Sequence, residues 1–215
     1  MTKRRVFCPE ILDALEDRLA LSHAGAAMPV PAPTVHPASV SVRNNATPPD
    51  RGTRVFEINF LTGMIPHHQM AINMSRLAQR YGVDPQVRDL ARRIISEQRP
   101  EMVRMQRFLA VDGVRGYRPG VSADEQMDLQ TLGSQRGTAF DVAFLKMMTD
   151  HHTRAIQGDG MGMVGARECQ GKAKQPGVLQ LCSQIIATQS RELTEMQGLL
   201  GRLGQAPGRP GMLMV

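Results

Sequence analysis

Two adjacent histidines set among methionines, His67 and His68, constrain this chain more than any other feature, because the stretch that contains them occurs twice. The first copy spans residues 60–72, and the second spans residues 144–156, an offset of 84 positions (151 − 67 = 84). Both copies keep Phe, Leu, Met, His, His, Ala and Ile in register. A repeat within one chain shows which positions both halves retain, so the sequence predicts two similar units that share their His and Met positions.

Each copy follows a helical period. At 100° per residue, one apolar stripe that includes a histidine falls on a single helix face. The stripe contains Phe56, Phe60, Met64, His67, Ala71 and Met74 in the first copy, and Phe140, Phe144, Met148, His151 and Ala155 in the second. His67 and His151 are therefore predicted to face the core. His68 and His152 diverge from them by one residue's rotation and are predicted to lie on the flank.

A second helix follows each copy, at about 85–110 and 178–203, and both carry the same polar pattern on their inward stripe. The matched positions are Gln98, Glu101 and Met105 in one helix and Gln189, Glu192 and Met196 in the other, at an offset of 91 (189 − 98 = 91). A buried amide without a partner is costly. The repeated Gln therefore predicts a hydrogen bond to an imidazole or to a metal-bound water.

These patterns predict an all-α fold in which two repeated helical hairpins pack as one four-helix bundle. The apolar content fits helix interiors, since the chain has 15 Met but only 6 Phe, 2 Tyr and no Trp. The predicted parts are a leader (1–23), a disordered Pro/Ala-rich linker (24–52), the bundle (53–203) and a flexible tail (204–215). Within the bundle we expect repeat one at 53–111, a connection with one short helix at 112–136, and repeat two at 137–203.

The first residues favour export without matching a standard signal peptide. A basic start is followed by acidic residues that interrupt the apolar region, although segment 15–22 resembles a leader of many exported bacterial proteins. Cys169 and Cys182 can form a disulfide if the protein is exported, and otherwise would be two partly buried thiols.

The charge pattern does not favour nucleic acid as a partner. The net charge is +6, but the Arg residues between 76 and 107 are spread along helices, without aromatic interleaving. No apolar run reaches the roughly 18 residues that a membrane span needs. We therefore expect no integral membrane segment.

The doubled motif resembles domain-of-unknown-function family 305. The motif consists of Met64-Ile-Pro-His-His-Gln-Met-Ala-Ile72 with Gln98-x-x-Glu101-x-x-x-Met105, and the second copy over 140–152 and 189–196. The resemblance implies a ferritin-like four-helix bundle, commonly exported, with members that bind copper through Met and His. The chain departs from the family pattern at Pro100 and at Gly158–Gly162, where helix and Met usually continue.

Thioether and imidazole donors together favour copper, with Cu(I) preferred where Met predominates and silver accepted for the same softness. Iron is a weaker candidate, and calcium and magnesium prefer oxygen. The candidate ligands are Met64, His67, His68, Met74, Met105, Met148, His151, His152, Met161 and Met196, with Gln98, Glu101, Gln189 and Glu192 as the residues that hydrogen-bond them. A copper donor or acceptor protein and a second copy of the chain are the other partners considered.

Two alternatives remain open from the sequence. In the first, His and Gln form buried hydrogen-bond networks in a structural or interaction bundle that holds no metal. In the second, a ferritin-like di-iron oxidoreductase, the carboxylates at matched positions are ligands; these are Glu57, Glu101, Asp141 and Glu192. The Glu-x-x-His pair of such enzymes does not occur in the sequence. No catalytic motif is recognised, so we do not expect an enzyme.

Overall fold

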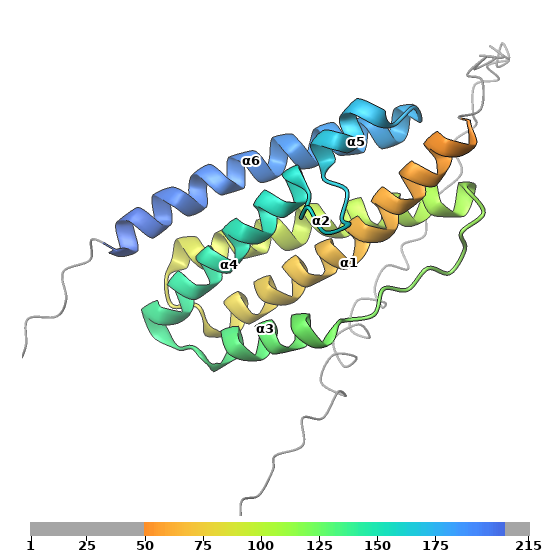
Figure 1. The fold of residues 1–215 in the computed structure, drawn as a ribbon. Helices are drawn as coiled ribbons and strands as arrows, with labels where there is room; N and C mark the ends of the chain where they lie inside the picture. Colours follow the sequence, from red (N-terminus) through yellow and green to blue (C-terminus); the bar gives the residue numbers. More distant parts are fainter. Residues whose placement is uncertain (1–49, 205–215) are drawn as a thin grey trace, which may run out of the picture. The chain divides into compact units, whose positions relative to one another are not determined.

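The computed structural model describes residues 50–204, and every regular element in that range is an α-helix. Figure 1 shows four long and two short helices. They are α1 (Arg51–Tyr81), α2 (Pro85–Val111), α3 (Ala123–Ser134), α4 (Gly137–Gln157), α5 (Ala166–Lys172) and α6 (Pro176–Gly204). The predicted all-α fold is confirmed. The predicted leader, nearly all of the linker and most of the tail lie outside the described residues.

Side-chain caps determine where several helices begin. Asp50 accepts hydrogen bonds from the first free N–H groups of α1 at 2.9 and 3.1 Å, and Asp84 does the same for α2 at 2.8 and 3.2 Å. Ser122 and Glu125 form a capping box at the start of α3, the short helix predicted in the connection. These oxygens satisfy amide groups that have no partner within the helix. Because of Asp50, α1 begins at Arg51, two residues before the predicted boundary.

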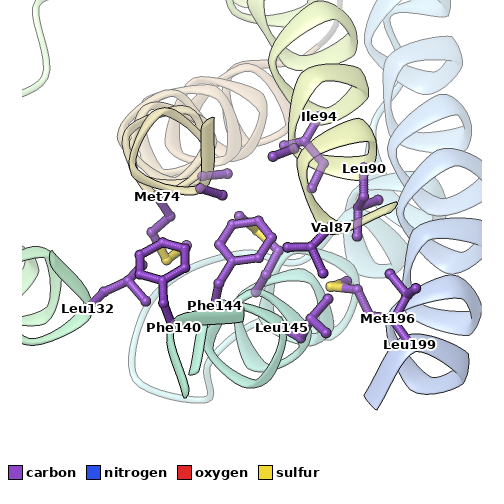
Figure 2. Close-up of a cluster of buried hydrophobic side chains, with 14 of the residues drawn as sticks. Met74, Val87, Leu90, Ile94, Leu132, Phe140, Phe144, Leu145, Met196 and Leu199 are labelled. Carbon is purple, nitrogen blue, oxygen red and sulfur yellow. The ribbon is translucent and has the colours of Figure 1, made fainter. Parts of the chain in front are cut away.

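Two apolar clusters fill the bundle. The α3-side cluster, shown in Figure 2, consists of Met70, Ala71, Met74, Ala78, Val87, Leu90, Ala91, Ile94, Leu132, Phe140, Phe144, Leu145, Met148, Met196 and Leu199. The α5-side cluster consists of Phe60, Leu61, Met64, Ile65, Met105, Leu109, Ala155, Ala166, Cys169, Ala173, Val178, Leu181, Cys182 and Ile185. Each of the four long helices contributes one half to each cluster.

The clusters also show in which direction each helix runs. The α3-side cluster joins the C-terminal halves of α1 and α6 to the N-terminal halves of α2 and α4. Therefore α1 and α6 run one way, and α2 and α4 run the other. Because α2 and α4 are parallel, the chain has to return along the bundle between them, through the connection that contains α3 (Figure 1). One long crossover of this kind is the ferritin-like connectivity.

Helix α5 lies in a segment for which the sequence predicted only a loop. Its apolar face, made by Ala166, Cys169 and the following Ala173, is buried in the α5-side cluster. Cys169 and Cys182 form a disulfide that ties α5 to α6, with their Cα atoms 6.1 Å apart. A seven-residue helix is too short to be stable in isolation. Tertiary packing and this covalent link therefore hold it in place, and neither leaves a clear helical period in the sequence.

The prolines of α1 and α2 do not restart their helices. Pro66 and Pro100 both lie inside continuous helices. Pro66 has no N–H to donate to the carbonyl of Thr62, one turn earlier. The Tyr117 hydroxyl donates to that carbonyl instead, at 2.7 Å. The crossover segment thus replaces the hydrogen bond that proline removes, close to the histidine pair.

Two buried carboxylates each accept hydrogen bonds from the turn that precedes a helix of the other hairpin. Glu57 of α1 accepts hydrogen bonds from the backbone N–H groups of Lys174 and Gln175, just before α6, at 2.7 and 2.8 Å. Asp141 of α4 accepts hydrogen bonds from the N–H groups that precede α2, the shortest at 2.8 Å from Asp84. Glu57 and Asp141 occupy matched positions of the two copies (141 − 57 = 84). Both of the carboxylates that only the di-iron alternative used are therefore engaged in holding turns.

Removing one of these caps is expected to destabilise the protein. Asp141→Ala should lower the free energy of unfolding by about 2–3 kcal/mol, because charge-assisted hydrogen bonds of roughly 1.5–3 kcal/mol are lost and buried N–H groups stay unpaired. Burial raises the pKa of the Asp141 carboxyl, and this desolvation offsets part of the stabilisation that its hydrogen bonds provide. Urea denaturation measures the effect. Glu168→Ala, which breaks only an exposed ion pair with Lys172, is the control, and an equally small change in both variants would contradict the capping role.

Candidate metal centre

A layer of polar side chains crosses the bundle between the two apolar clusters. All four long helices contribute to it, each with residues that lie between its two apolar halves. The polar layer consists of His67, His68, Gln98, Glu101, His151, His152, Gln189 and Glu192. Every one of these residues was predicted from the sequence as a ligand or as a ligand's hydrogen-bond partner. The structure thus brings all eight to one level of the bundle.

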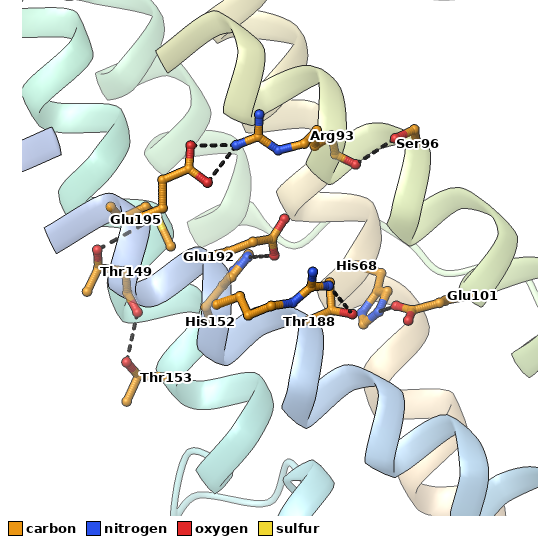
Figure 3. Close-up of polar contacts among 12 residues, drawn as sticks. His68, Arg93, Ser96, Glu101, Thr149, His152, Thr153, Thr188, Glu192 and Glu195 are labelled. Carbon is orange, nitrogen blue, oxygen red and sulfur yellow. Dashed lines mark hydrogen bonds and ion pairs between the residues drawn. The ribbon is translucent and has the colours of Figure 1, made fainter. Parts of the chain in front are cut away.

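Two histidine–carboxylate pairs lie in the polar layer, one within each helical hairpin. His68 Nε2 lies 2.9 Å from Glu101 Oε2, and His152 Nε2 lies 2.7 Å from Glu192 Oε2 (Figure 3). Both imidazoles are completely buried. The prediction that His68 and His152 lie on the flank is therefore wrong.

The error has a geometric cause. A helix in a four-helix bundle has two neighbours, so its buried arc is wide enough for two residues that are 100° apart. Helix α1 packs on α2 and also on α4. From it, His68 points to Glu101 of α2, while His67 points to His151 of α4. Adjacent histidines on α1 thus face different neighbours, and both are inside.

The other two histidines stack on each other. The ring centroids of His67 and His151 are 3.6 Å apart, at an interplanar angle of 29°. All four of their ring nitrogens are buried and have no hydrogen-bond partner among the described residues. Unpaired buried donors and acceptors are costly, and few are found in folded proteins. In both rings, therefore, no nitrogen is satisfied by the described part of the chain.

Burial also keeps the stacked histidines uncharged. It is the main reason why the pKa of His67 and of His151 falls well below the ordinary value of 6.5, and the neighbouring imidazoles and Arg154 lower both further. At neutral pH both rings are therefore neutral. A neutral imidazole has one bare nitrogen, which is the form that binds a metal ion.

The carboxylates orient the other two rings. A carboxylate accepts hydrogen bonds, so the Nε2 atoms of His68 and His152 are the donors in these pairs, and Nδ1 is the nitrogen left to bind a metal ion. This Nδ1 is buried and unpaired in both residues. A carboxylate that fixes the tautomer of a histidine in this way is a common partner of metal-binding imidazoles. Glu101 and Glu192 thus each hydrogen-bond a predicted ligand.

The buried glutamines do not contact the imidazoles as predicted. Gln98 and Gln189 are 2% and 1% exposed, and their amide oxygens and nitrogens have no partner in the part of the chain that the structure describes. Of the two predicted partners of these amides, the imidazole is therefore wrong, because the glutamates one turn further along α2 and α6 bind the histidines instead. A hydrogen bond to a metal-bound water stays a prediction. At the level of the polar layer, both amides are therefore buried polar groups without a hydrogen-bond partner among the described residues.

Methionines border the layer on both sides. Met64 and Met105 belong to the α5-side cluster, and Met148 and Met196 belong to the α3-side cluster. Each lies about one turn from a histidine or a glutamate of the layer. The Met196 sulfur accepts a hydrogen bond from the Thr149 hydroxyl at 3.8 Å. Four thioethers thus lie about one turn along their helices from a residue of the polar layer.

Two predicted methionines are elsewhere. Met74 lies two turns beyond His67 and packs beside Phe140 and Phe144 in the α3-side cluster (Figure 2). Met161 is 88% exposed on the connection between α4 and α5. Met163, which the sequence offers as the alternative to Met161 in the same loop, packs its side chain against Gly63 of α1, one turn before His67. Only the missing side chain at Gly63 hinted at this contact.

The donor set of the layer suits a soft ion better than a hard one. Imidazole nitrogens and thioethers are ligands of Cu(I), whereas di-iron sites need several carboxylates. Within residues 50–204, no group of three or more His, Cys, Asp and Glu side chains is arranged to hold a metal ion. The layer's two glutamates are each used by a histidine.

Comparison with known proteins agrees with this geometry. The family profile described as "Domain of unknown function (DUF305)" matches residues 57–200. The chain belongs to the DUF305 family. The resemblance drawn from the doubled His-His motif is thereby confirmed. No curated protein matches the chain.

Solved structures of DUF305 proteins share the fold. CopM in the Cu(I)-bound form is 29% identical over 68% of this chain and 96% of its own, with a TM-score of 0.59. CopM also matches in its Cu(II)-bound and Ag-bound forms, at 26% identity. A DUF305 fragment from Deinococcus radiodurans is 26% identical over 73% of this chain and 98% of its own, with a TM-score of 0.58. A DUF305 protein from Streptomyces coelicolor, 24% identical over 72% of this chain and 96% of its own, has a similar fold, with a TM-score of 0.60.

Proposed function

We propose that this DUF305 protein binds Cu(I) in its polar layer, for sequestration or for delivery to another protein. The observation that carries the proposal is the stacked pair of His67 and His151, whose four buried nitrogens have no partner. The residues that would hold the ion are these two histidines and the unpaired Nδ1 atoms of His68 and His152. The shell would be completed by thioethers of Met64, Met105, Met148 and Met196, each about one turn along its helix from a residue of the layer. Ag(I) would be accepted by the same donors.

The structural relatives support the choice of metal. CopM has been solved with Cu(I), with Cu(II) and with silver. The neutral state of the stacked histidines at neutral pH also favours binding, since no proton has to leave the ring. Binding and release without a chemical reaction need no catalytic group, and we propose no enzymatic activity.

The location proposed for the protein is outside the cytoplasm. The Cys169–Cys182 disulfide supports this, because disulfides persist mainly in oxidising compartments. The start of the sequence, with its resemblance to an export leader, points the same way. Among the described residues, no helix has the length and apolarity that crossing a membrane requires.

Titration with Cu(I) tests the proposal. Anaerobic protein is added to the coloured complex of Cu(I) with a competing chelator such as bicinchoninate, and loss of colour reports transfer of the ion. We expect the protein to withdraw Cu(I) stoichiometrically. Unchanged colour at a protein excess would contradict the proposal and favour the metal-free structural bundle. Fe(II) with dioxygen is the parallel sample, and oxygen consumption there would favour the di-iron alternative.

A further inference from the structure

The connection between α4 and α5 is a compact loop whose ends meet. A side-chain carbon at Gly165 would lie only 2.2 Å from the backbone nitrogen of Gly158, and one at Gly158 would lie 2.8 Å from the carbonyl oxygen of Met163. Gly158 also has a φ of 87°, which favours glycine. The chain therefore leaves α4 and returns to the same point, so residues 159–164 project as one excursion.

Asp159 braces this excursion from within. Its Oδ1 accepts hydrogen bonds from the backbone N–H groups of Met161, Gly162 and Met163 at 2.8, 3.0 and 2.9 Å. Three bonds to one oxygen hold the backbone of these residues in a fixed turn. The two methionine side chains are thus presented from a defined backbone.

The two methionines of the loop differ in what they contact. Met161 is 88% exposed, more than any other large apolar residue that the structure describes. Met163 is half-buried and packs against Gly63, where its Cγ would lie 3.6 Å from an added side-chain carbon. Figure 1 shows the connection passing over α1. Gly63 precedes His67 by four residues and lies on the same helix face.

His67 is the histidine of the layer that lies nearest to solvent. It is partly exposed, whereas His68, His151 and His152 are buried, although its ring nitrogens are themselves covered and unpaired. From solvent inward, the chain thus presents first Met161, then Met163, and then the α1 face that carries His67. An exposed methionine alone would mean little. A braced loop that places two thioethers in this order, above an unpaired imidazole, calls for a function.

We propose that Met161 and Met163 capture Cu(I) at the surface and pass it to His67, so that the α4–α5 loop is the entry port of the polar layer. The inference rests on the proposed function and assigns a role in uptake to residues outside the buried site. Thioethers select Cu(I) and stay unprotonated at any pH. Ligand exchange from one sulfur to the next and then to nitrogen requires no change of oxidation state. The loop departs from the usual family pattern, in which the helix continues, so this port belongs to this chain's own sequence.

The test separates the rate of uptake from affinity at equilibrium. Met161→Leu together with Met163→Leu removes both sulfurs at nearly constant volume, and stopped-flow mixing with the Cu(I)–bicinchoninate complex follows uptake by the full chain. We expect the uptake rate to fall by about tenfold or more, because a barrier rises. The equilibrium affinity should change by less than about threefold, because the end states are the same. Met127→Leu, at a 63% exposed methionine of α3, is the control and should leave both quantities unchanged.

Three results would overturn the inference. One is uptake by the double variant at the wild-type rate. Another is a loss of affinity with an unchanged uptake rate, which would make the two methionines final ligands rather than a port. The third is an equal slowing in Met127→Leu, which would make the effect unspecific. Failure of the wild-type protein to bind Cu(I) at all would be seen first, in the equilibrium titration, and would refute the proposed function itself.

Discussion

Replacing both stacked histidines, His67→Ala together with His151→Ala, is expected to lower the affinity for Cu(I) by more than about 100-fold, since loss of residues that merely orient a ligand already costs about 10- to 100-fold. The two rings contribute four of the unpaired nitrogens in the polar layer, and they face each other across α1 and α4. Alanine offers no donor, and the remaining His68 and His152 each have one nitrogen engaged by a glutamate. Competition titration against a Cu(I) chelator measures the change.

The matched control is Gln69→Ala. Gln69 lies on the same turn of α1, but its amide donates to Asn73 of its own helix at 3.0 Å, away from the layer. We expect its affinity for Cu(I) to remain at the wild-type value. Circular dichroism should show that both variants keep their helices. Wild-type affinity in the folded double-histidine variant would contradict the assignment of the site, whatever the origin of the remaining binding.

Most of the fold and most of the layer could be predicted because a repeated helical period carries both. The apolar stripes locate the four long helices, and the matched offsets of 84 and 91 locate His, Gln and Glu at one level. Glu101 and Glu192 were predicted as hydrogen-bond partners, and the structure pairs each with a histidine. Periodicity is reliable here because long amphipathic helices determine which residues are buried.

The remaining features depend on contacts between segments, which periodicity does not encode. A single stripe has one inward direction, so it placed His68 on the flank, whereas packing against two neighbouring helices buries two directions at once. Met163 contacts α1 beside Gly63, a contact between distant segments that no helical period encodes. Helix α5 is held by a disulfide and by packing rather than by its own propensity. Glu57 and Asp141 looked like metal ligands, and only the structure shows the backbone amides that occupy them.

The polar layer also connects the stability of the protein to metal binding. The polar layer interrupts the apolar core across all four long helices, and its unpaired atoms are a cost that the metal-free fold carries. Residues that bind a ligand often lower stability in this way. A ligand that binds only the folded protein recovers the loss by mass action. We therefore expect the polar layer to make the stability of the bundle sensitive to conditions that protonate imidazoles, such as low pH.

The stability of the metal-free protein is accordingly expected to fall steeply as the pH drops below about 6.5. Burial lowers the pKa of His67 and His151 in the folded protein, whereas in the unfolded chain both keep the ordinary value of 6.5. Below pH 6.5 the unfolded chain therefore binds protons that the folded protein refuses. The free energy of unfolding should decrease by up to about 1.4 kcal/mol per pH unit for each imidazole, until the pH reaches the folded pKa.

Urea denaturation between pH 7.5 and 5 measures this slope, and His67→Phe together with His151→Phe is the comparison. Phenylalanine keeps two stacked rings but cannot bind a proton, and it removes the unpaired nitrogens. The variant should therefore lose the slope and exceed the wild type in stability at pH 5. Asp50, Asp84 and Asp159 do not confuse the comparison, because their pKa values are lowered from 3.8 and they titrate below this range. An equal slope in both proteins would mean that the stacked histidines already take up protons in the folded state. That result would contradict the conclusion that both rings are neutral in the bundle.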